Sequence, residues 1–143
     1  MNIFRPGWNH AWHFDESEYT TTLCLQQPEE GGEFEFTAPL RASQGELAEE
    51  QVASVLAERS AYEPELLGDG CGHGAQLPAV PVSTAPFEPG ALQIFGGRYS
   101  LHHVKSIPKT ATRDRLVAVL CFATEPDMVN SPEVQQMFWG RST

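Results

Sequence analysis

Residues 115–123, RLVAVLCFA, place an unbroken run of apolar side chains behind a single arginine. In a β-strand, successive side chains point to opposite faces, so Leu116 and Leu120 would lie on one face and Val117 and Val119 on the other. A strand that is apolar on both faces needs cover on both sides. The segment therefore predicts a strand that belongs to a layered β-structure.

Proline and glycine, with 11 and 12 residues, divide the rest of the chain into short segments. The alternating segment 32–36, GEFEF, predicts a strand with Phe34 and Phe36 on one face and glutamates on the other. Further strands are predicted at 20–26, 91–95 and 98–104, and residues 60–90 are predicted to form a long loop with one short strand near 77–82. Many short strands between turns favour a sandwich or barrel, here a single domain over residues 1–143.

Two helices are predicted. In segment 46–59 the apolar residues occur at helical spacing, at Leu47, Val52, Val55 and Leu56. In segment 131–140, Ser131 suits the N-cap position and Pro132 the first helical position.

Composition excludes several classes of protein. With 9 Lys+Arg against 19 Asp+Glu, the net charge is −10, which argues against a nucleic-acid partner. No apolar run is long enough to span a membrane, and the N-terminus lacks the apolar core of a secretory signal.

Cys24, Cys71 and Cys121 cannot all pair with one another. Because Cys24 and Cys121 lie in apolar runs, we expect buried free thiols and a reducing, cytoplasmic compartment.

One constellation can hold a metal. His13 and Asp15 are two residues apart, so on a strand they point to the same side and can occupy neighbouring positions on one ion. His102 and His103 lie on a predicted strand and point to opposite faces, so at most one of them joins the pair. Two histidines and one carboxylate form the facial triad of non-haem Fe(II) oxygenases. The alternative is that these residues never meet.

An arginine begins the apolar strand. Burying Arg115 is costly unless its guanidinium is paired, and a dicarboxylate cosubstrate would supply a bidentate partner. Arg113 has the same parity along the strand and is the competing candidate. The alternative is that both arginines are solvated in the preceding turn.

The order of these residues resembles that of the Fe(II)/2-oxoglutarate-dependent oxygenases. The segments GWNHAWHFDESEYTTTLCLQQPEEGGEFEF and EPGALQIFGGRYSLHHV resemble, within that superfamily, small bacterial free-amino-acid hydroxylases and radical halogenases. The resemblance covers about residues 2–41 and 86–141. It implies a double-stranded β-helix, that is, a jelly-roll or cupin-like barrel, with a few flanking helices.

The resemblance also implies roles for individual residues. His13, Asp15 and His102 would bind Fe(II), and Arg115, with Arg113 as the alternative, would anchor 2-oxoglutarate. O₂ would be the second cosubstrate. Halogenating relatives replace the carboxylate ligand by a small residue, so Asp15 implies hydroxylation, or a related oxidation, of an amino acid or another small molecule.

Substrate contacts follow from the same resemblance. In the relatives, the residue three positions before the first ligand and the residue directly after the acidic ligand contact the amino acid. These positions correspond to His10 and Glu16. An aromatic residue near the C-terminus closes the pocket in the relatives, and it corresponds to Trp139. A regular pleat would turn His10 and Glu16 to the wrong face, so a bulge near the motif is expected. The alternative for Trp139 is packing of the terminal helix.

Two other functions are alternatives to an oxygenase. A cupin-like metal protein that does not use 2-oxoglutarate is disfavoured, because cupins usually have two closely spaced histidines at the position of His13 and Asp15. The other is a non-catalytic binding module or assembly subunit. Relatives carry a helical segment before the first ligand strand, whereas Met1 is twelve residues before His13, so a minimal form, a partial gene product or completion by another subunit is expected. Incomplete cover of the strand at 115–123 predicts a homo-oligomer.

Overall fold

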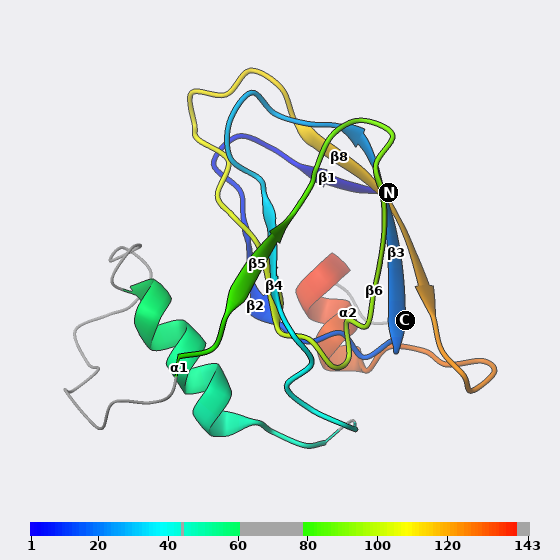
Figure 1. The fold of residues 1–143 in the computed structure, drawn as a ribbon. Helices are drawn as coiled ribbons and strands as arrows, with labels where there is room; N and C mark the ends of the chain where they lie inside the picture. The colour runs from blue at the N-terminus through cyan, green and yellow to red at the C-terminus, as the bar shows by residue number, and fades with distance from the viewer. Residues whose placement is uncertain (44, 61–78, 140–143) are drawn as a thin grey trace.

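The computed structural model describes residues 1–43, 45–60 and 79–139 and builds them mainly from β-strands (Figure 1). The strands are β1 (Asn2–Phe4), β2 (His10–His13), β3 (Tyr19–Gln26), β4 (Phe34–Thr37), β5 (Val82–Ala85), β6 (Leu92–Phe95), β7 (His102–Val104) and β8 (Arg115–Phe122), and the helices are α1 (Glu49–Ser60) and α2 (Pro132–Trp139). The predicted mainly β fold with few helices is confirmed for these residues.

The strands form two antiparallel sheets of four strands each. One sheet has the order β1-β8-β3-β6 and the other the order β2-β7-β4-β5. The long strand β8 is central in the first sheet, where it pairs with β3 from Tyr19↔Phe122 to Gln26↔Leu116. In Figure 1 the two sheets lie on opposite sides of the molecule, with β4 and β5 facing β3 and β6.

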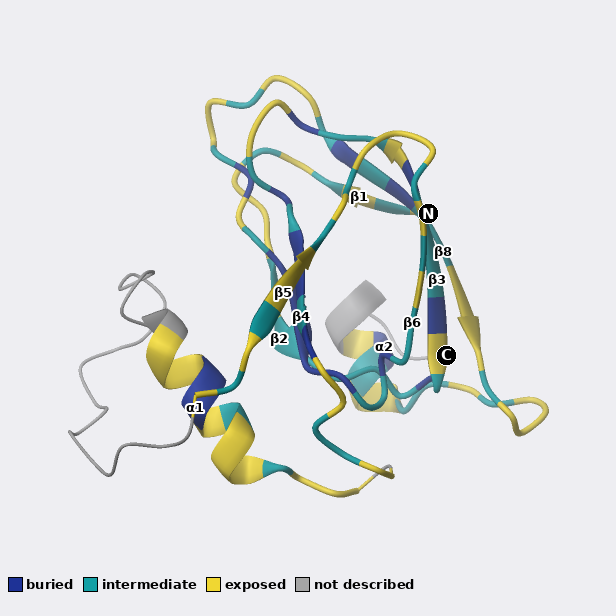
Figure 2. Cartoon of the chain, in the orientation of Figure 1, coloured by how far each residue is buried: buried dark blue, intermediate teal, exposed yellow. Residues whose placement is uncertain are grey.

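The apolar strand β8 is covered on its inner side. Val117 is 1% exposed and Cys24, its partner on β3, is 2% exposed. On the outer side, Leu120 and Phe122 are 62% and 53% exposed, and Figure 2 shows this end of β8 in the exposed colour. The second apolar face of the strand is therefore not buried by the described residues.

Strand β4 alternates as its sequence predicts, but both of its faces are buried. Phe34 points into the space between the sheets, where its ring lies 4.8 Å from that of Phe95. Glu35 points to the other side and accepts a hydrogen bond from Nε2 of His103 at 2.8 Å. The ring of His103 stacks on Trp12 at 3.9 Å. The glutamate on the outer side of this sheet is therefore a buried hydrogen-bond partner and not a solvated charge.

Helix α1 differs from its prediction at the N-terminal end. It begins at Glu49, after Ala48 adopts a φ of 49°, so Leu47 lies outside the helix and is 64% exposed. Val55 is fully buried as expected, whereas Leu56 is 41% exposed. The helix at the C-terminal end agrees with its prediction, because the Ser131 hydroxyl accepts a hydrogen bond from the Val134 N–H. Neither helix in the described ranges has the length and apolar character that a membrane span requires.

Two strand predictions were wrong in extent, and one strand was missed. The strand predicted at 98–104 is only β7, because residues 97–100 form a turn in which the N–H groups of Tyr99 and Ser100 donate to the carbonyl of Gly96. The strand predicted near 77–82 is β5, which is placed by pairing with β4 and overlaps the prediction only at Val82. Strand β1 was not predicted, because a strand of three residues is too short to show an alternation of apolar and polar side chains. Of the predicted loop at 60–90, residues 61–78 lie outside the described residues.

The cysteine prediction was half right. Cys24 is a buried free thiol, but Cys121 is a free thiol that is exposed. Cys121 lies near the end of β8 and lines a cavity between the sheets, so the inner face is not packed solid there. Cys71 lies outside the described residues.

We expect Glu35→Ala to lower the free energy of unfolding by about 1–3 kcal/mol, because it removes a buried hydrogen-bond partner of His103. The matched control is Glu33→Ala. The Glu33 side chain is 41% exposed and lies 3.9 Å from Lys105, so its loss should change stability by less than about 1 kcal/mol. Urea denaturation of both variants measures the difference. Equal effects would show that the Glu35 contact does not stabilise the fold.

Candidate metal centre

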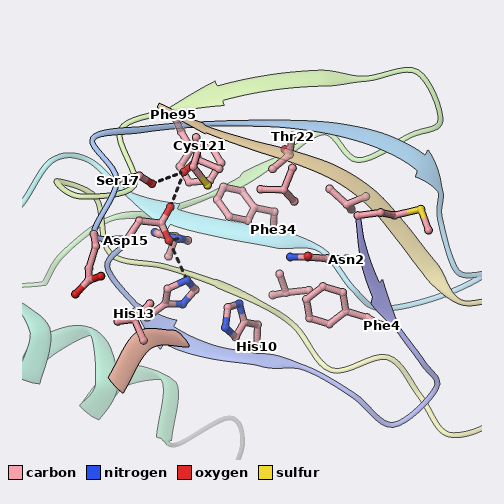
Figure 3. Close-up of a pocket in the computed structure, with 18 of the residues that line it drawn as sticks. Asn2, Phe4, His10, His13, Asp15, Ser17, Thr22, Phe34, Phe95 and Cys121 are labelled. Carbon is pink, nitrogen blue, oxygen red and sulfur yellow. Dashed lines mark hydrogen bonds and ion pairs between the residues drawn. The ribbon is translucent and has the colours of Figure 1, made fainter. Parts of the chain in front are cut away.

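Three predicted ligands come together between the sheets. One side-chain ligand atom from each of His13, Asp15 and His102 lies within 4.8 Å of the other two. Oδ1 of Asp15 is 3.5 Å from Nε2 of His13 and 3.5 Å from Nε2 of His102. Figure 3 shows His13 and Asp15 pointing toward one another from the end of β2. Donor atoms at this separation are compatible with a single divalent cation.

The pairing of β2 with β7 creates this arrangement. His13 is the antiparallel partner of His102, and their ring centroids are 4.2 Å apart. Asp15 follows the end of β2, and its N–H donates to the carbonyl of Gly97 at 2.9 Å. The ligands are thus held by backbone hydrogen bonds on both sides of the site.

Both ligand imidazoles are oriented by backbone carbonyls. Nδ1 of His13 lies 2.7 Å from the oxygen of Ala11, and Nδ1 of His102 lies 2.8 Å from the oxygen of Ser100. Because a carbonyl oxygen only accepts, each Nδ1 carries the proton and donates. Nε2 is therefore the nitrogen of each ring that faces Asp15 and that is placed to bind a metal.

The carboxylate of Asp15 is held in its ionised form. Burial alone would raise the pKa of Asp15, but its side-chain interactions with His102 and His13 outweigh this and hold the pKa well below its usual range. Thr20 contributes in the same direction, because its hydroxyl donates to Oδ2 at 2.7 Å. Since Oδ2 is occupied by Thr20, Oδ1 is the oxygen that faces both histidines.

A glycine leaves the space that Asp15 occupies. A Cβ atom at Gly97 would lie 2.0 Å from Oδ2 and 2.6 Å from Cγ of Asp15. No other residue type fits at this position without displacing the carboxylate. Thr20 and Gly97 were both missed by sequence reasoning. For Thr20 the one available signal was that Thr20 and Thr22, two residues apart on a predicted strand, point to the same face. For Gly97 there was no signal, because nothing in the sequence distinguishes it from Gly96.

The cluster lines a cavity of about 280 Å³ between the two sheets. Apolar side chains form much of its wall, and Phe34 and Phe95 approach His102 at ring-centroid distances of 5.5 and 5.1 Å. Val134 of α2 and the preceding Asn130 also line it, so the C-terminal helix borders the cavity. A space of this size accommodates small molecules.

Arg115 lines the same cavity and is 4% exposed. Its Nε donates to the carbonyl of Gly32 at 2.9 Å, and its guanidinium lies over the rings of Phe87, at 4.0 Å, and Phe4, at 5.2 Å. Burial lowers the pKa of Arg115 to about 10, so the group remains a cation at neutral pH. Within the described part of the chain, no carboxylate forms an ion pair with it.

Arg113 lies elsewhere. It is exposed, and its Nε donates to Oε1 of Glu29 at 3.0 Å. The same glutamate accepts hydrogen bonds from Thr112, which lowers its pKa to about 2. The structure therefore brings Arg115, and not Arg113, into the cavity with the metal cluster.

His10 faces the cavity because of the expected irregularity in β2. The register against β7 shifts between His10 and His13, which allows residues of opposite parity to line the same space. The two rings are 4.1 Å apart. Burial, followed by the neighbouring His13 and His102, lowers the pKa of His10 to about 3, so its imidazole is neutral near pH 7.

Glu16 lines the cavity but is anchored to the C-terminal helix. Its Oε2 accepts a hydrogen bond from the N–H of Ser131 at 2.6 Å, and its carbonyl accepts from Arg98. Trp139 is the last residue of α2, and its side chain lies outside the described residues. His103 points away from the cavity toward Glu35, as the strand period predicted.

No protein-family model matches the chain, and no curated protein shows significant sequence similarity to it.

We expect Gly97→Ala to weaken divalent-metal binding about 10- to 100-fold, because the added methyl group displaces the Asp15 carboxylate. Gly96→Ala is the control, since the added Cβ would approach the ring of Tyr99 at 3.1 Å and the carbonyl oxygen of Glu18 at 3.8 Å, but not Asp15. Calorimetric titration with Fe(II) under anaerobic conditions, or with Mn(II) in air, compares the variants. Unchanged affinity in Gly97→Ala would show that Asp15 is not a ligand.

Proposed function

We propose that the protein is an Fe(II)- and 2-oxoglutarate-dependent oxygenase that hydroxylates an unactivated C–H bond of a small molecule, an amino acid or amino-acid derivative. The observation that carries the proposal is the presence of a buried arginine in the same cavity as the His-Asp-His cluster. A metal site alone is compatible with many activities. A buried cation beside it, with no protein carboxylate in an ion pair among the described residues, selects for an anionic ligand.

The donor set fits iron. Two neutral imidazole nitrogens and one carboxylate oxygen are the ligands of the facial triad, and three protein ligands leave further positions for a cosubstrate and O₂. The hydrogen bonds from Nδ1 of both histidines and from Thr20 to Asp15 provide the supporting contacts that a metal site needs. All three of these contacts are made by residues of the chain itself.

The environment of Arg115 fits the distal carboxylate of 2-oxoglutarate. Its Nε is used by Gly32, which leaves the two terminal nitrogens of the guanidinium for a bidentate contact. Phe4 and Phe87 exclude water from the guanidinium and so strengthen its attraction for an anion. In a cupin-like metal protein that does not use 2-oxoglutarate, the buried guanidinium of Arg115 would have no cosubstrate carboxylate to bind.

The strand order supports a jelly-roll. Along the chain, β1, β3, β6 and β8 contribute to one sheet and β2, β4, β5 and β7 to the other, so the chain crosses repeatedly between two facing sheets. This alternation is what a double-stranded β-helix requires, and it accounts for a cavity that both sheets line.

The protein and its bound groups have separate tasks. When bound, iron and 2-oxoglutarate would supply the chemistry: with O₂, 2-oxoglutarate would be converted to succinate and CO₂ while R–H would become R–OH. His13, Asp15 and His102 would hold the ion, and Arg115 would orient the cosubstrate. The apolar wall keeps water out, and His10 supplies a polar group that can orient a small polar substrate.

Anaerobic titration with Fe(II) and 2-oxoglutarate tests the proposal. We expect an absorption band in the visible region that develops only when both are present. A cupin-like protein would bind the metal without this band, and a non-catalytic module would bind neither. Succinate release in air, screened over free amino acids, then identifies the substrate.

Asp15→Ala should abolish succinate formation and weaken iron binding, because it leaves two neutral imidazoles on a divalent ion. Asp114→Ala, which changes a carboxylate outside the cavity, is the control for net charge. Metal titration and succinate assay are run on both. Unchanged iron affinity in Asp15→Ala would remove Asp15 from the ligand set.

Arg115→Ala should raise the 2-oxoglutarate concentration needed for half-saturation by a factor equivalent to about 2–5 kcal/mol, because it removes one partner of a buried charge pair. Metal affinity should remain nearly unchanged. Arg113→Ala is the matched control, and since this side chain is exposed and paired with Glu29, its effect should be small. The reverse order of effects would assign the anchor to Arg113.

A further inference from the structure

The outer side of the β1-β8-β3-β6 sheet carries an apolar patch. Its large side chains are between 43% and 72% exposed, and we call them together the outer apolar face: Ile3, Tyr19, Leu92, Ile94, Leu120 and Phe122. The strand register places them on one side, since Tyr19 pairs with Phe122 while Thr21 pairs with both Leu120 and Ile94. They therefore form a continuous surface across three strands, with Ile3 extending it onto β1.

No charge interrupts this face. The four strands contain a single charged residue, Arg115, and its side chain points into the cavity. The chain as a whole has a net charge of −10. Because the outward-facing residues of these four strands are uncharged, a partner on this face meets no charged side chain of the strands themselves.

Neither described helix covers the face. Val134 of α2 lines the cavity on the inner side of the sheet. In Figure 1, helix α1 lies on the same side of the molecule as β4 and β5, away from β3, β6 and β8. In the described part of the chain, this side of the sheet is open, as Figure 2 shows for the end of β8.

The size of the face matches that of an interface. Six large side chains with this exposure present an area on the order of 700 Å², close to the ~800 Å² that each partner contributes to a standard protein interface. The largest apolar patch on a typical monomer is about 300–600 Å².

We propose that this face is the interface between two copies of the chain. A two-fold axis brings the same surface of each copy together, so apolar side chains meet apolar side chains over the whole contact. Two sheets packed in this way interdigitate their side chains, as in a β-sandwich. An anionic membrane is a poorer partner, because the two net negative charges repel.

The proposal also predicts how salt affects assembly. Each copy carries a net charge of −10, so two copies repel at low ionic strength. Added salt screens this repulsion and strengthens apolar contact. The dimer should therefore be tighter at about 0.3 M than at about 0.01 M salt, the opposite of an interface held by ion pairs.

Sedimentation equilibrium of the full chain at micromolar concentration tests the proposal. We expect a mass of twice 15.8 kDa. Ile94→Glu should weaken the dimer at least about 100-fold, because the two-fold axis places two charges in one apolar interface. Leu47→Glu is the matched control: Leu47 is 64% exposed but lies next to α1, so the dimer should persist. Ile94→Lys, which makes the net charge less negative, should dissociate the dimer as well.

Each outcome bears on the interface. Circular dichroism and metal titration on Ile94→Glu and Ile94→Lys confirm that dissociation is not unfolding. A wild-type chain that stays monomeric at all salt concentrations overturns the proposal, and co-sedimentation of that monomer with phosphatidylcholine vesicles would assign the face to lipid instead. A dimer that survives both Ile94 variants while Leu47→Glu dissociates it would place the interface elsewhere.

Discussion

The antiparallel pairing of β2 with β7 is the constraint on which the candidate site depends. It places His13 opposite His102, although the two residues are far apart in the sequence. The shift in register within β2 turns His10 to the same side. A slip of one residue would turn His102 outward and His103 inward, because side chains alternate along a strand, and the ligand cluster would be lost. The candidate metal centre is therefore a consequence of strand register.

Around this pairing, every polar group of the cluster has a defined partner. Backbone carbonyls orient both ligand imidazoles, Thr20 binds the oxygen of Asp15 that faces away from them, and Gly97 leaves room for the carboxylate. Because these contacts already orient the ligands, the free-energy cost of reorienting them when a metal binds is small. Arg115 is held in the same manner by Gly32 and by two aromatic rings. The cavity thus presents an anionic and a cationic group that do not neutralise each other.

The two faces of the β1-β8-β3-β6 sheet differ in character. Its inner face lines the cavity and carries Arg115, whereas its outer face is apolar and uncharged. The alternation of side chains along β3 and β8 makes this separation possible within one layer. The large side chains of the outer apolar face do not line the cavity, so the proposals for assembly and for ligand binding can be tested by separate substitutions.

The sequence by itself determined the strands with a clear pattern and the types of residue at the site. The alternation in β4, the two-sided apolar run of β8 and the opposite directions of His102 and His103 follow from a two-residue period, which is a local property. The tertiary structure decided what depends on contacts between distant segments: the position of β5, the pairing of β1 and the choice of Arg115 over Arg113, which have the same parity. It also assigned Thr20 and Gly97 to Asp15. These features could not be predicted, because hydrogen bonding between strands and the space around a buried carboxylate are set by residues far away in the chain, and no local period encodes them.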